Sequence, residues 1–284
     1  MHGEGDLLDF IKNVYSGGIL NANREDCYHA VLLGCMEMMR SGITSCIDVN
    51  GWTSLFAAEA ALDAFQDAGI RGTEARLVVD QDPLQLGLAP ASEVSTVLDE
   101  TVALIEKWEG NDRIRVWFHP TMPYQCSDEL LRKISDLSRE LDVGFSIHLH
   151  EEKSEIDNWI ENTGLSPIKY YYENGIDILN ERNIATHCVW LDDEEIDILK
   201  RTNTSVSHNA VINLHSAGIA PIPKLLAAGV TVGLGTDDAF GDMFEVMKTT
   251  ALVHKLPAGN SSVILPDKIL EMATIDGARV MRLD

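Results

Sequence analysis

The chain alternates short β-rich runs with longer amphipathic helical patterns along its whole length. This alternation is typical of repeated β-α units that build a parallel sheet. The seven strand-like runs are residues 44–50, 75–79, 113–119, 144–150, 183–191, 204–209 and 231–237. A (β/α)8-type barrel, which commonly takes about 250 residues, fits both this order and a chain of 284 residues. We therefore predict the α/β class and one barrel domain spanning residues 1–284.

One strand of that barrel is missing from the pattern. A helical pattern over residues 25–42 precedes the first strand-like run. A closed barrel of this type requires a strand before that helix, so the chain starts one strand late. We expect an incomplete barrel. A gene fragment, a start codon placed too far downstream and a degenerate barrel are all open explanations.

The composition of the chain argues against some classes of binding partner. The 45 acidic and 22 basic residues give a net charge of -23, which repels nucleic-acid phosphates and anionic membrane surfaces. The five cysteines are scattered and form no C-x-x-C pair, a usage typical of reduced thiols in the cytoplasm. No apolar run approaches the roughly 20 residues of a membrane span. We predict a cytoplasmic protein that binds a small molecule, with no nucleic-acid or membrane partner.

Side chains able to bind a metal stand at three predicted strand ends. The stretch "GFSIHLHEE" places His148 and, three residues later, Glu151 where the strand passes into a loop. His187 ends the next strand, and Asp237 ends the last one. The carboxyl ends of barrel strands open onto one face, so these groups should converge. Imidazole with carboxylate suits zinc or iron better than magnesium or calcium, and we assign His148 and Asp237 as metal ligands, with His187 as a third ligand or a neighbour.

Further residues are candidates for the pocket wall. His150 shares the inward parity of His148, and His208 ends its own strand, although a lone histidine there is often a hydrogen-bonded structural residue. Trp190 is a candidate too, and packing would also explain it. Gly233 and Gly235 fall on the face of Asp237 and should leave room inside the barrel. The remaining histidines are interpreted as structural or exposed: His2, His29, His119, His215 and His254.

Five motifs together resemble one known family. They are "HLHE", "ATHCVWLDDEEIDIL", "SVSHN", "GIAPIPKLLAAGVTVGLGTD" and "PDKILEMATIDGARVMRLD". In order and spacing they are similar to the amidohydrolase superfamily, in the branch of ring deaminases and s-triazine chlorohydrolases. The resemblance implies a metal-dependent (β/α)8 barrel flanked by a small β-sandwich built from both chain ends. The H-x-H metal ligands of the family's first strand, and the half-sandwich that should follow "RLD", are absent from this sequence.

The resemblance also implies a role for each candidate residue. His148 resembles the strand-five metal ligand, and Glu151 resembles the carboxylate that moves protons between water and the substrate ring. His187 resembles the histidine that orients and polarises the reacting groups. Asp237 resembles the strand-eight ligand that accepts a proton from water. These roles imply a hydrolytic deaminase of an amino-substituted N-heterocycle that uses one divalent ion, Zn²⁺ or Fe²⁺. A chlorohydrolase and a truncated, non-catalytic barrel are the alternatives.

Some positions depart from the nucleoside deaminases of that branch. Thr121 stands where those enzymes have a substrate-binding histidine, and a position near Ile19 stands where they have a glutamate. Ala210 replaces the usual proline after "SHN". The departures place Thr121 in the candidate pocket and predict that simple heterocycles are better substrates than nucleosides. The resemblance also favours a homodimer.

Overall fold

The computed structural model describes residues 21–50, 54–82, 93–239 and 241–283. The chain divides into two compact units. The first comprises Met1–Arg40 and Thr44–Phe145, and the second comprises Ser41–Ile43 and Ser146–Asp284. Each of the seven predicted strand regions overlaps a strand in the described part of the chain. The proposal of one domain over residues 1–284 stays a prediction.

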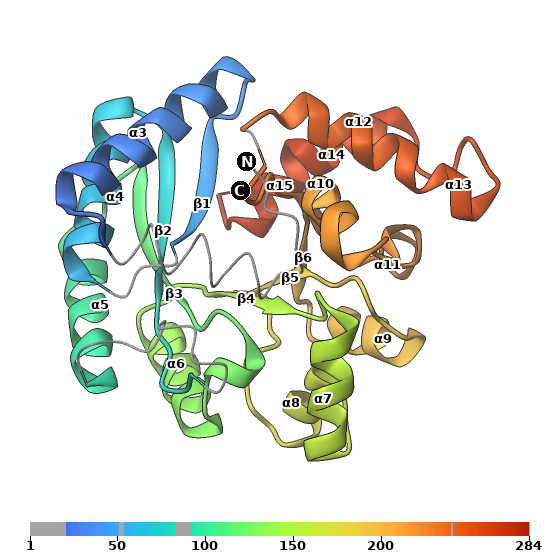
Figure 1. The fold of residues 1–284 in the computed structure, drawn as a ribbon, viewed down its shortest axis with the longest axis horizontal. Helices are drawn as coiled ribbons and strands as arrows, with labels where there is room; N and C mark the ends of the chain where they lie inside the picture. The colour runs from blue at the N-terminus through green and yellow to red at the C-terminus, as the bar shows by residue number, and fades with distance from the viewer. Residues whose placement is uncertain (1–20, 51–53, 83–92, 240, 284) are drawn as a thin grey trace. The chain divides into compact units, whose positions relative to one another are not determined.

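The first unit contains a three-stranded parallel sheet in the order β1-β2-β3 (Figure 1). Its elements are α3 (Arg24–Arg40), β1 (Ser45–Asn50), α4 (Leu55–Ala68), β2 (Arg71–Leu77), α5 (Val94–Trp108), β3 (Ile114–His119), η3 (Pro123–Gln125) and α6 (Asp128–Glu140). Helices join successive strands, as parallel pairing requires. After α6, Phe145 forms a parallel bridge with Phe118 of β3.

Small side chains let the helices of this unit approach closely. Ala57 and Ala60 of α4 pack with Cys27 of α3, and the two helices lie side by side in Figure 1. On the strand side, a Cβ added at Gly72 would come within 2.3 Å of the Phe65 ring. Glycine at this position therefore lets α4 pack against β2.

The second strand begins earlier than predicted. The sequence pattern placed it at residues 75–79, whereas β2 runs Arg71–Leu77 and pairs with β1 from Ser45 onward. Its first half holds Arg71, Thr73 and Glu74, which break the apolar pattern used to find strands. Pairing with two neighbouring strands fixes β2 here, because it satisfies the backbone whatever the side chains are.

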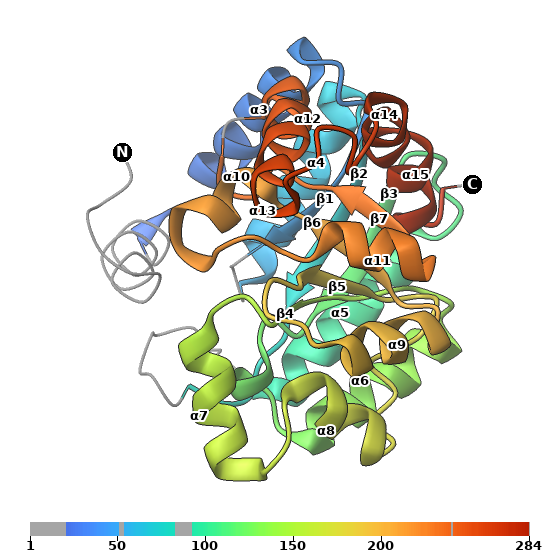
Figure 2. The same cartoon turned by 90° about the vertical axis from the view of Figure 1, so that its right-hand side faces the viewer.

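The second unit contains a four-stranded parallel sheet in the order β4-β5-β6-β7. Its elements are β4 (Ser146–Leu149), α7 (Lys153–Thr163), α8 (Pro167–Glu173), β5 (Ile184–His187), α9 (Asp193–Arg201), β6 (Ser205–His208), α10 (Ala210–Ile212), η4 (Asn213–Ala217), α11 (Ile222–Ala228), β7 (Val232–Leu234), α12 (Met243–Val253), α13 (Lys255–Ala258), α14 (Pro266–Ala273) and α15 (Ile275–Val280). Strand order follows chain order, so the carboxyl ends of all four strands lie at one edge. α7 and α8 lie side by side after β4 in both ribbon views (Figures 1 and 2).

Local sequence explains how these helices begin and pack. α9 starts with a capping box, in which the Asp192 carboxylate accepts from the Glu195 backbone N–H and Glu195 accepts from the Asp192 backbone N–H. α15 packs on β7, where a Cβ added at Gly233 would lie 3.1 Å from Val280. Gly233 therefore makes room for a helix. This corrects the expectation that both glycines of the last strand open space inside the barrel.

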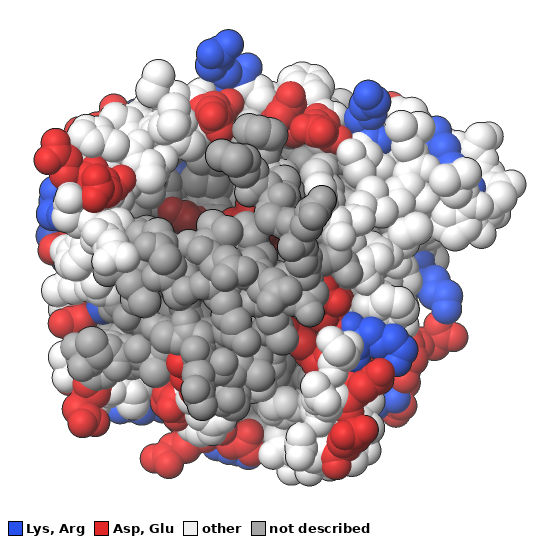
Figure 3. All heavy atoms as spheres, in the orientation of Figure 1, with Lys and Arg blue, Asp and Glu red and all other residues white. Residues whose placement is uncertain are grey.

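The surface agrees with the acidic composition. Acidic side chains of the described residues appear at several separate places around the margin of the face shown in Figure 3. None of the helices that the structure describes is long and apolar enough to cross a membrane.

Candidate active site

The ends of β4, β5 and β7 bring the four principal sequence candidates together. The His148 and His187 rings stack with centroids 5.2 Å apart and planes inclined by 24°. His187 Nε2 lies 3.4 Å from Glu151 Oε2 and 3.5 Å from Asp237 Oδ2. These three separations make His187 the centre of the group. We call His148, Glu151, His187 and Asp237 the strand-end group.

The backbone of this group is unusual. His187 has φ of 72° and Asp237 has φ of 55°, which is the left-handed region that side chains with a Cβ rarely enter. Cys188, which follows His187, has φ of 51°, and His150, just after β4, has φ of 57°. Such conformations cost energy and persist where the surrounding structure enforces them, often at functional sites. The strain therefore supports a function for this edge of the sheet independently of residue type.

The electrostatics of the group centre on Glu151. Its side chain is buried, and burial raises the pKa of Glu151 to about 7. His148 opposes the rise in pKa, whereas the nearby Asp237 adds to it. A carboxyl group with this pKa exchanges its proton near neutral pH. Glu151 is therefore suited to carry a proton in either direction.

The donor types around His187 fit part of a divalent-metal site. Two imidazoles and two carboxylates are donors that zinc and iron accept, and the crowding of negative charge there is what a cation would relieve. The residues that the structure describes include no group of three or more His, Cys, Asp or Glu placed to hold a metal ion. The strand-end group thus supplies some ligands of a coordination shell.

His150 does not join the strand-end group. Its Nδ1 donates to the Trp190 carbonyl oxygen at 2.9 Å, and its Nε2 accepts from the Ile168 N–H at 3.4 Å. Glu195 Oε1 lies 3.7 Å from the same Nε2. Burial lowers the pKa of His150, which favours the neutral ring whose Nε2 accepts from Ile168. In this geometry His150 ties the end of β4 to the segment between β5 and α9.

His208 forms a buried pair with His254. Their Nε2 atoms are 3.3 Å apart, so one ring donates and the other accepts. Burial lowers the pKa of His208 to about 3 and that of His254 to about 4. His208 Nδ1 has no hydrogen-bond partner among the residues described. The sequence interpretation had set His254 aside as structural or exposed, and the structure shows it buried against a pocket candidate.

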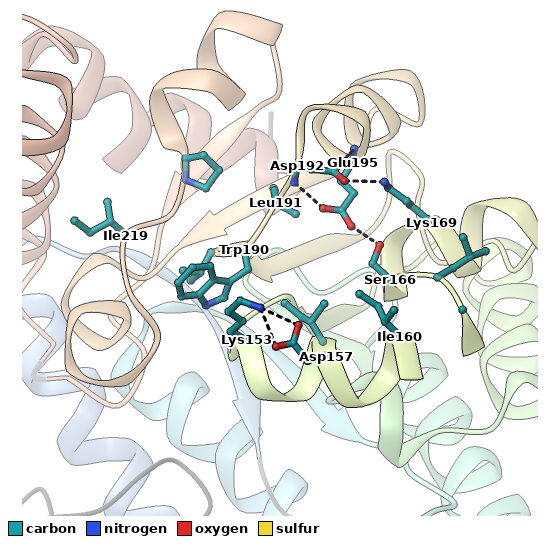
Figure 4. Close-up of a pocket in the computed structure, with 15 residues that line it drawn as sticks. Lys153, Asp157, Ile160, Ser166, Lys169, Trp190, Leu191, Asp192, Glu195 and Ile219 are labelled. Carbon is teal, nitrogen blue, oxygen red and sulfur yellow. Dashed lines mark hydrogen bonds and ion pairs between the residues drawn. The ribbon is translucent and has the colours of Figure 1, made fainter. Parts of the chain in front are cut away.

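Trp190 lines a cavity of about 530 Å³ beside the strand-end loops (Figure 4). Ion pairs border this cavity, between Lys153 and Asp157 and between Lys169 and Asp192. The indole is 43% exposed. It is therefore available to a ligand of this cavity.

Thr121 lies in the first unit, just after β3. It is buried, with φ of 41°. Ile19, the other position at which the sequence departs from nucleoside deaminases, lies outside the described residues.

Sequence interpretation missed two asparagines that contact the strand-end group. Asn209 Nδ2 donates to Asp237 Oδ2 at 2.7 Å, and Asn213 Oδ1 accepts from His187 Nδ1 at 2.8 Å. The available signal was the motif "SHN", in which Asn209 directly follows a strand-end histidine.

It also missed two acids in the sheet of the first unit. Asp48 and Glu74 are register partners on β1 and β2, and burial raises the pKa of Asp48 to about 6. The signal for Asp48 was a charged residue inside the predicted run 44–50, whereas Glu74 lies just before the predicted run 75–79 and had no such signal.

Known proteins resemble this chain over most of its length. It is 36% identical over 269 residues to the 5'-deoxyadenosine deaminase of Methanothermobacter thermautotrophicus, covering 92% of this chain and 60% of the relative. It is also 36% identical over 268 residues to the 5-methylthioadenosine/S-adenosylhomocysteine deaminase of Desulforudis audaxviator, covering 92% and 58%. The chain thus spans about three fifths of the length of these curated relatives.

A solved structure shares the fold. An adenosine deaminase from Xanthomonas campestris with bound zinc superimposes with a TM-score of 0.88 at 23% identity, covering 99% of this chain and 62% of that one. This likeness confirms the predicted α/β, (β/α)8-type fold class. The model of the amidohydrolase family matches residues 1–284. The chain therefore belongs to the amidohydrolase family.

Proposed function

We propose that this chain carries the catalytic barrel region of a hydrolytic deaminase, which replaces an amino group on an N-heterocycle with oxygen and releases ammonia. The observation that carries the proposal is the convergence of Glu151 and Asp237 on His187 Nε2, at 3.4 and 3.5 Å. Both separations exceed ordinary hydrogen bonds, so the three polar groups face a common space instead of saturating one another. We propose that the reacting molecule binds beside these three groups.

A divalent ion fits the same group. His148 and Asp237 would hold it, with His187 beside them, and we propose Zn²⁺ as the ion, with Fe²⁺ as the alternative. When bound, such an ion lowers the pKa of water toward about 7 and so supplies hydroxide at neutral pH. The zinc in the adenosine deaminase that shares this fold agrees with that choice.

Glu151 and Asp237 divide the proton transfers. Asp237 accepts the proton of the attacking water, because its carboxylate is held in place by Asn209 and by the Asp238 N–H at 2.7 Å. Glu151 delivers a proton to a ring nitrogen of the substrate, which its pKa of about 7 permits. The adjacent ring carbon then becomes electrophilic, and water adds to it.

His187 stabilises the resulting tetrahedral intermediate when its Nε2 carries a proton. The intermediate carries developing negative charge on the added oxygen, and a protonated Nε2, which faces Glu151 and Asp237, donates a hydrogen bond to that oxygen, whereas a neutral ring with its lone pair on Nε2 does not. Collapse breaks the carbon–nitrogen bond. The amino group leaves as ammonia after taking up the proton that Asp237 accepted from water, and the hydroxyl proton of the intermediate returns to Glu151 as the carbonyl forms. Each such proton transfer contributes about 10²- to 10⁴-fold to the rate.

The substrate class rests on the named relatives. Two of them are called deaminases of 5'-deoxyadenosine and of 5-methylthioadenosine and S-adenosylhomocysteine, so we propose a 6-aminopurine, carried as a base or as a 5'-substituted adenosine. Thr121 had argued against nucleosides, and these relatives argue for them. A cytoplasmic location and a homodimer stay predictions from the sequence.

A panel of substrates tests the proposal. The protein is loaded with Zn²⁺, and ammonia release is measured with adenine, 5'-deoxyadenosine, 5-methylthioadenosine, guanine and an amino-s-triazine. Chloride release is measured with a chloro-s-triazine. Ammonia from an adenine compound supports the proposal. Chloride as the main product favours the chlorohydrolase, and a zinc-loaded protein that turns over none of them favours the non-catalytic barrel.

A further inference from the structure

The segment after β6 carries two buried asparagines that each contact a different member of the strand-end group. Asn209 is 4% exposed and Asn213 is 1% exposed. The Asn213 backbone N–H donates to the Asn209 carbonyl oxygen at 3.0 Å, which fixes the spacing between them. Asn213 also opens the π-helical turn η4, a rare conformation that is frequent at functional sites.

Asn213 determines which nitrogen of His187 carries the proton. Its Oδ1 lies 2.8 Å from His187 Nδ1, and a carbonyl oxygen only accepts, so Nδ1 must donate. A neutral His187 therefore keeps its lone pair on Nε2. That is the nitrogen facing Glu151 and Asp237.

Asn209 holds the carboxylate of Asp237 through a hydrogen bond from its side chain. Its Nδ2 donates to Oδ2 at 2.7 Å, while the Asp238 N–H holds Oδ1. The amide of Asn209 is itself oriented, because its Oδ1 accepts from Ser207 Oγ at 3.1 Å. The direction of hydrogen bonding runs from Ser207 through Asn209 to Asp237.

Gly235 provides the space in which Asn209 sits. A Cβ added at Gly235 would lie 2.3 Å from Asn209 Oδ1 and 2.9 Å from Ser207 Oγ. Any larger residue would therefore displace the amide. The need for glycine at this position is separate evidence that the placement of Asn209 is specified.

We propose that Asn209 and Asn213 are positioning residues, which act through Asp237 and His187 respectively. Asn213 sets the tautomer of His187, and Asn209 sets the orientation of the Asp237 carboxylate. One short segment thereby aligns two groups from two other strands. The kinetic consequence rests on the proposed function, whereas the tautomer and the carboxylate geometry do not.

The first test measures the tautomer directly in the metal-free protein. Ring ¹⁵N chemical shifts of His187 are recorded at rising pH until they no longer change, so that the neutral ring is compared. We expect the Nδ1–H form in the unchanged protein and in Asn213→Asp, which keeps an acceptor. We expect a shift toward the Nε2–H form in Asn213→Leu. An unchanged His187 spectrum in Asn213→Leu would overturn the role of Asn213.

The second test measures kinetics on the zinc-loaded protein. Asn213→Leu and Asn209→Leu should each lower kcat by about 10- to 100-fold with a smaller change in KM, the range found when groups supporting an active site are removed. The matched control is Asn183→Leu, which removes another buried amide, one that donates to the Ile178 carbonyl at 3.1 Å in the same unit. It should cost stability and leave kcat unchanged. An equal loss of kcat in Asn183→Leu would show that the losses in the other two variants come from general destabilisation.

The third test uses the contact at Gly235. Gly235→Ala should reproduce the kcat loss of Asn209→Leu, and combining Gly235→Ala with Asn209→Ala should lose much less than the sum of the two single changes. Additive losses would contradict the proposed role of Asn209. An unchanged protein that shows the expected tautomer yet turns over none of the substrates would refute the proposed function and leave the assignment of Asn213 standing.

Discussion

Two buried histidine–glutamate pairs lie in the second unit, and their surroundings differ more than their distances. His187 Nε2 is 3.4 Å from Glu151 Oε2, and His150 Nε2 is 3.7 Å from Glu195 Oε1. All four side chains are nearly inaccessible. We call the first the open pair and the second the closed pair.

The closed pair is surrounded by short hydrogen bonds. Glu195 accepts from Ser166 Oγ and from the Asp192 N–H, as Figure 4 shows, and His150 uses both ring nitrogens on the backbone of neighbouring segments. Buried polar groups satisfied in this way stabilise one arrangement of the chain. The closed pair therefore has a structural role, because its hydrogen bonds connect β4, α8 and α9.

The open pair has a different set of neighbours. Glu151 faces a second carboxylate, Asp237, and its pKa is raised to about 7. Asn213 fixes His187 through Nδ1, and Nε2 turns toward the carboxylates. Groups that are fixed on one side and unsaturated on the other are what proton transfer needs. The contrast shows that partners, rather than burial or distance, separate a structural histidine from a catalytic candidate.

The largest effect on turnover is expected from Glu151→Gln, which changes the open pair. The amide cannot carry a proton, so we expect kcat for ammonia release to fall by about 10²- to 10⁴-fold while bound metal is kept. Metal analysis beside an ammonia assay measures both. Glu152→Gln, one residue later at the start of α7, is the control and should retain turnover. Near-normal turnover of Glu151→Gln would place Glu151 outside the chemistry.

The reverse outcome is expected for the closed pair. Glu195→Leu removes the acceptor of two hydrogen bonds and the capping box of α9, and should lower the free energy of unfolding by about 2–4 kcal/mol. Turnover per folded molecule should stay the same. Denaturant unfolding and the ammonia assay test the two halves of the prediction. The neighbouring Glu194→Leu, which removes an exposed ion pair with Lys169, should cost less than about 1 kcal/mol.

The sequence predicted the strand-end group better than it predicted the strand bounds. Successive parallel strands place their carboxyl ends at one edge, so His148, His187 and Asp237 had to meet once the β-α order was recognised. The start of β2 at Arg71 was missed. The pattern used to find strands depends on apolar residues, and several of the first residues of β2 are polar.

The sequence could not distinguish the open pair from the closed pair. His148 and His150 share one parity, which placed both on the inward face. The left-handed φ of 57° at His150 ends that alternation and turns its ring toward Trp190 and Ile168. Parity holds only while the backbone stays extended. The roles of Asn209 and Asn213 depend on hydrogen-bond directions, which no spacing in the sequence encodes.

An effect that develops gradually with pH is expected from the His208–His254 pair. Their folded pKa values of about 3 and 4 lie below the unfolded value near 6.5, so the unfolded chain takes up protons first as pH falls. The stability that this pair contributes is therefore complete above pH 6.5. It is lost toward pH 4, by up to about 1.4 kcal/mol per pH unit for each group.

A variant isolates this contribution from the other titrations of the protein. The difference in unfolding free energy between the unchanged protein and His254→Gln should narrow or reverse as pH falls from 6.5 to 4. Urea unfolding at several pH values measures it. A difference that stays constant with pH would show that His254 titrates alike in the folded and unfolded chain.

The smallest effect is expected at Ser166, which donates to Glu195 of the closed pair. Ser166→Ala removes a single hydroxyl that donates to Glu195, and leaves the Asp192 N–H and the His150 ring in place. A neutral donor lost to a buried carboxylate costs about 1–2 kcal/mol. The free energy of unfolding should fall by that amount, with no change in turnover. The double variant Ser166→Ala with Glu195→Leu should be no less stable than Glu195→Leu alone, because the hydroxyl has lost its acceptor. Further destabilisation in the double variant would mean that Ser166 stabilises the protein through a contact other than Glu195.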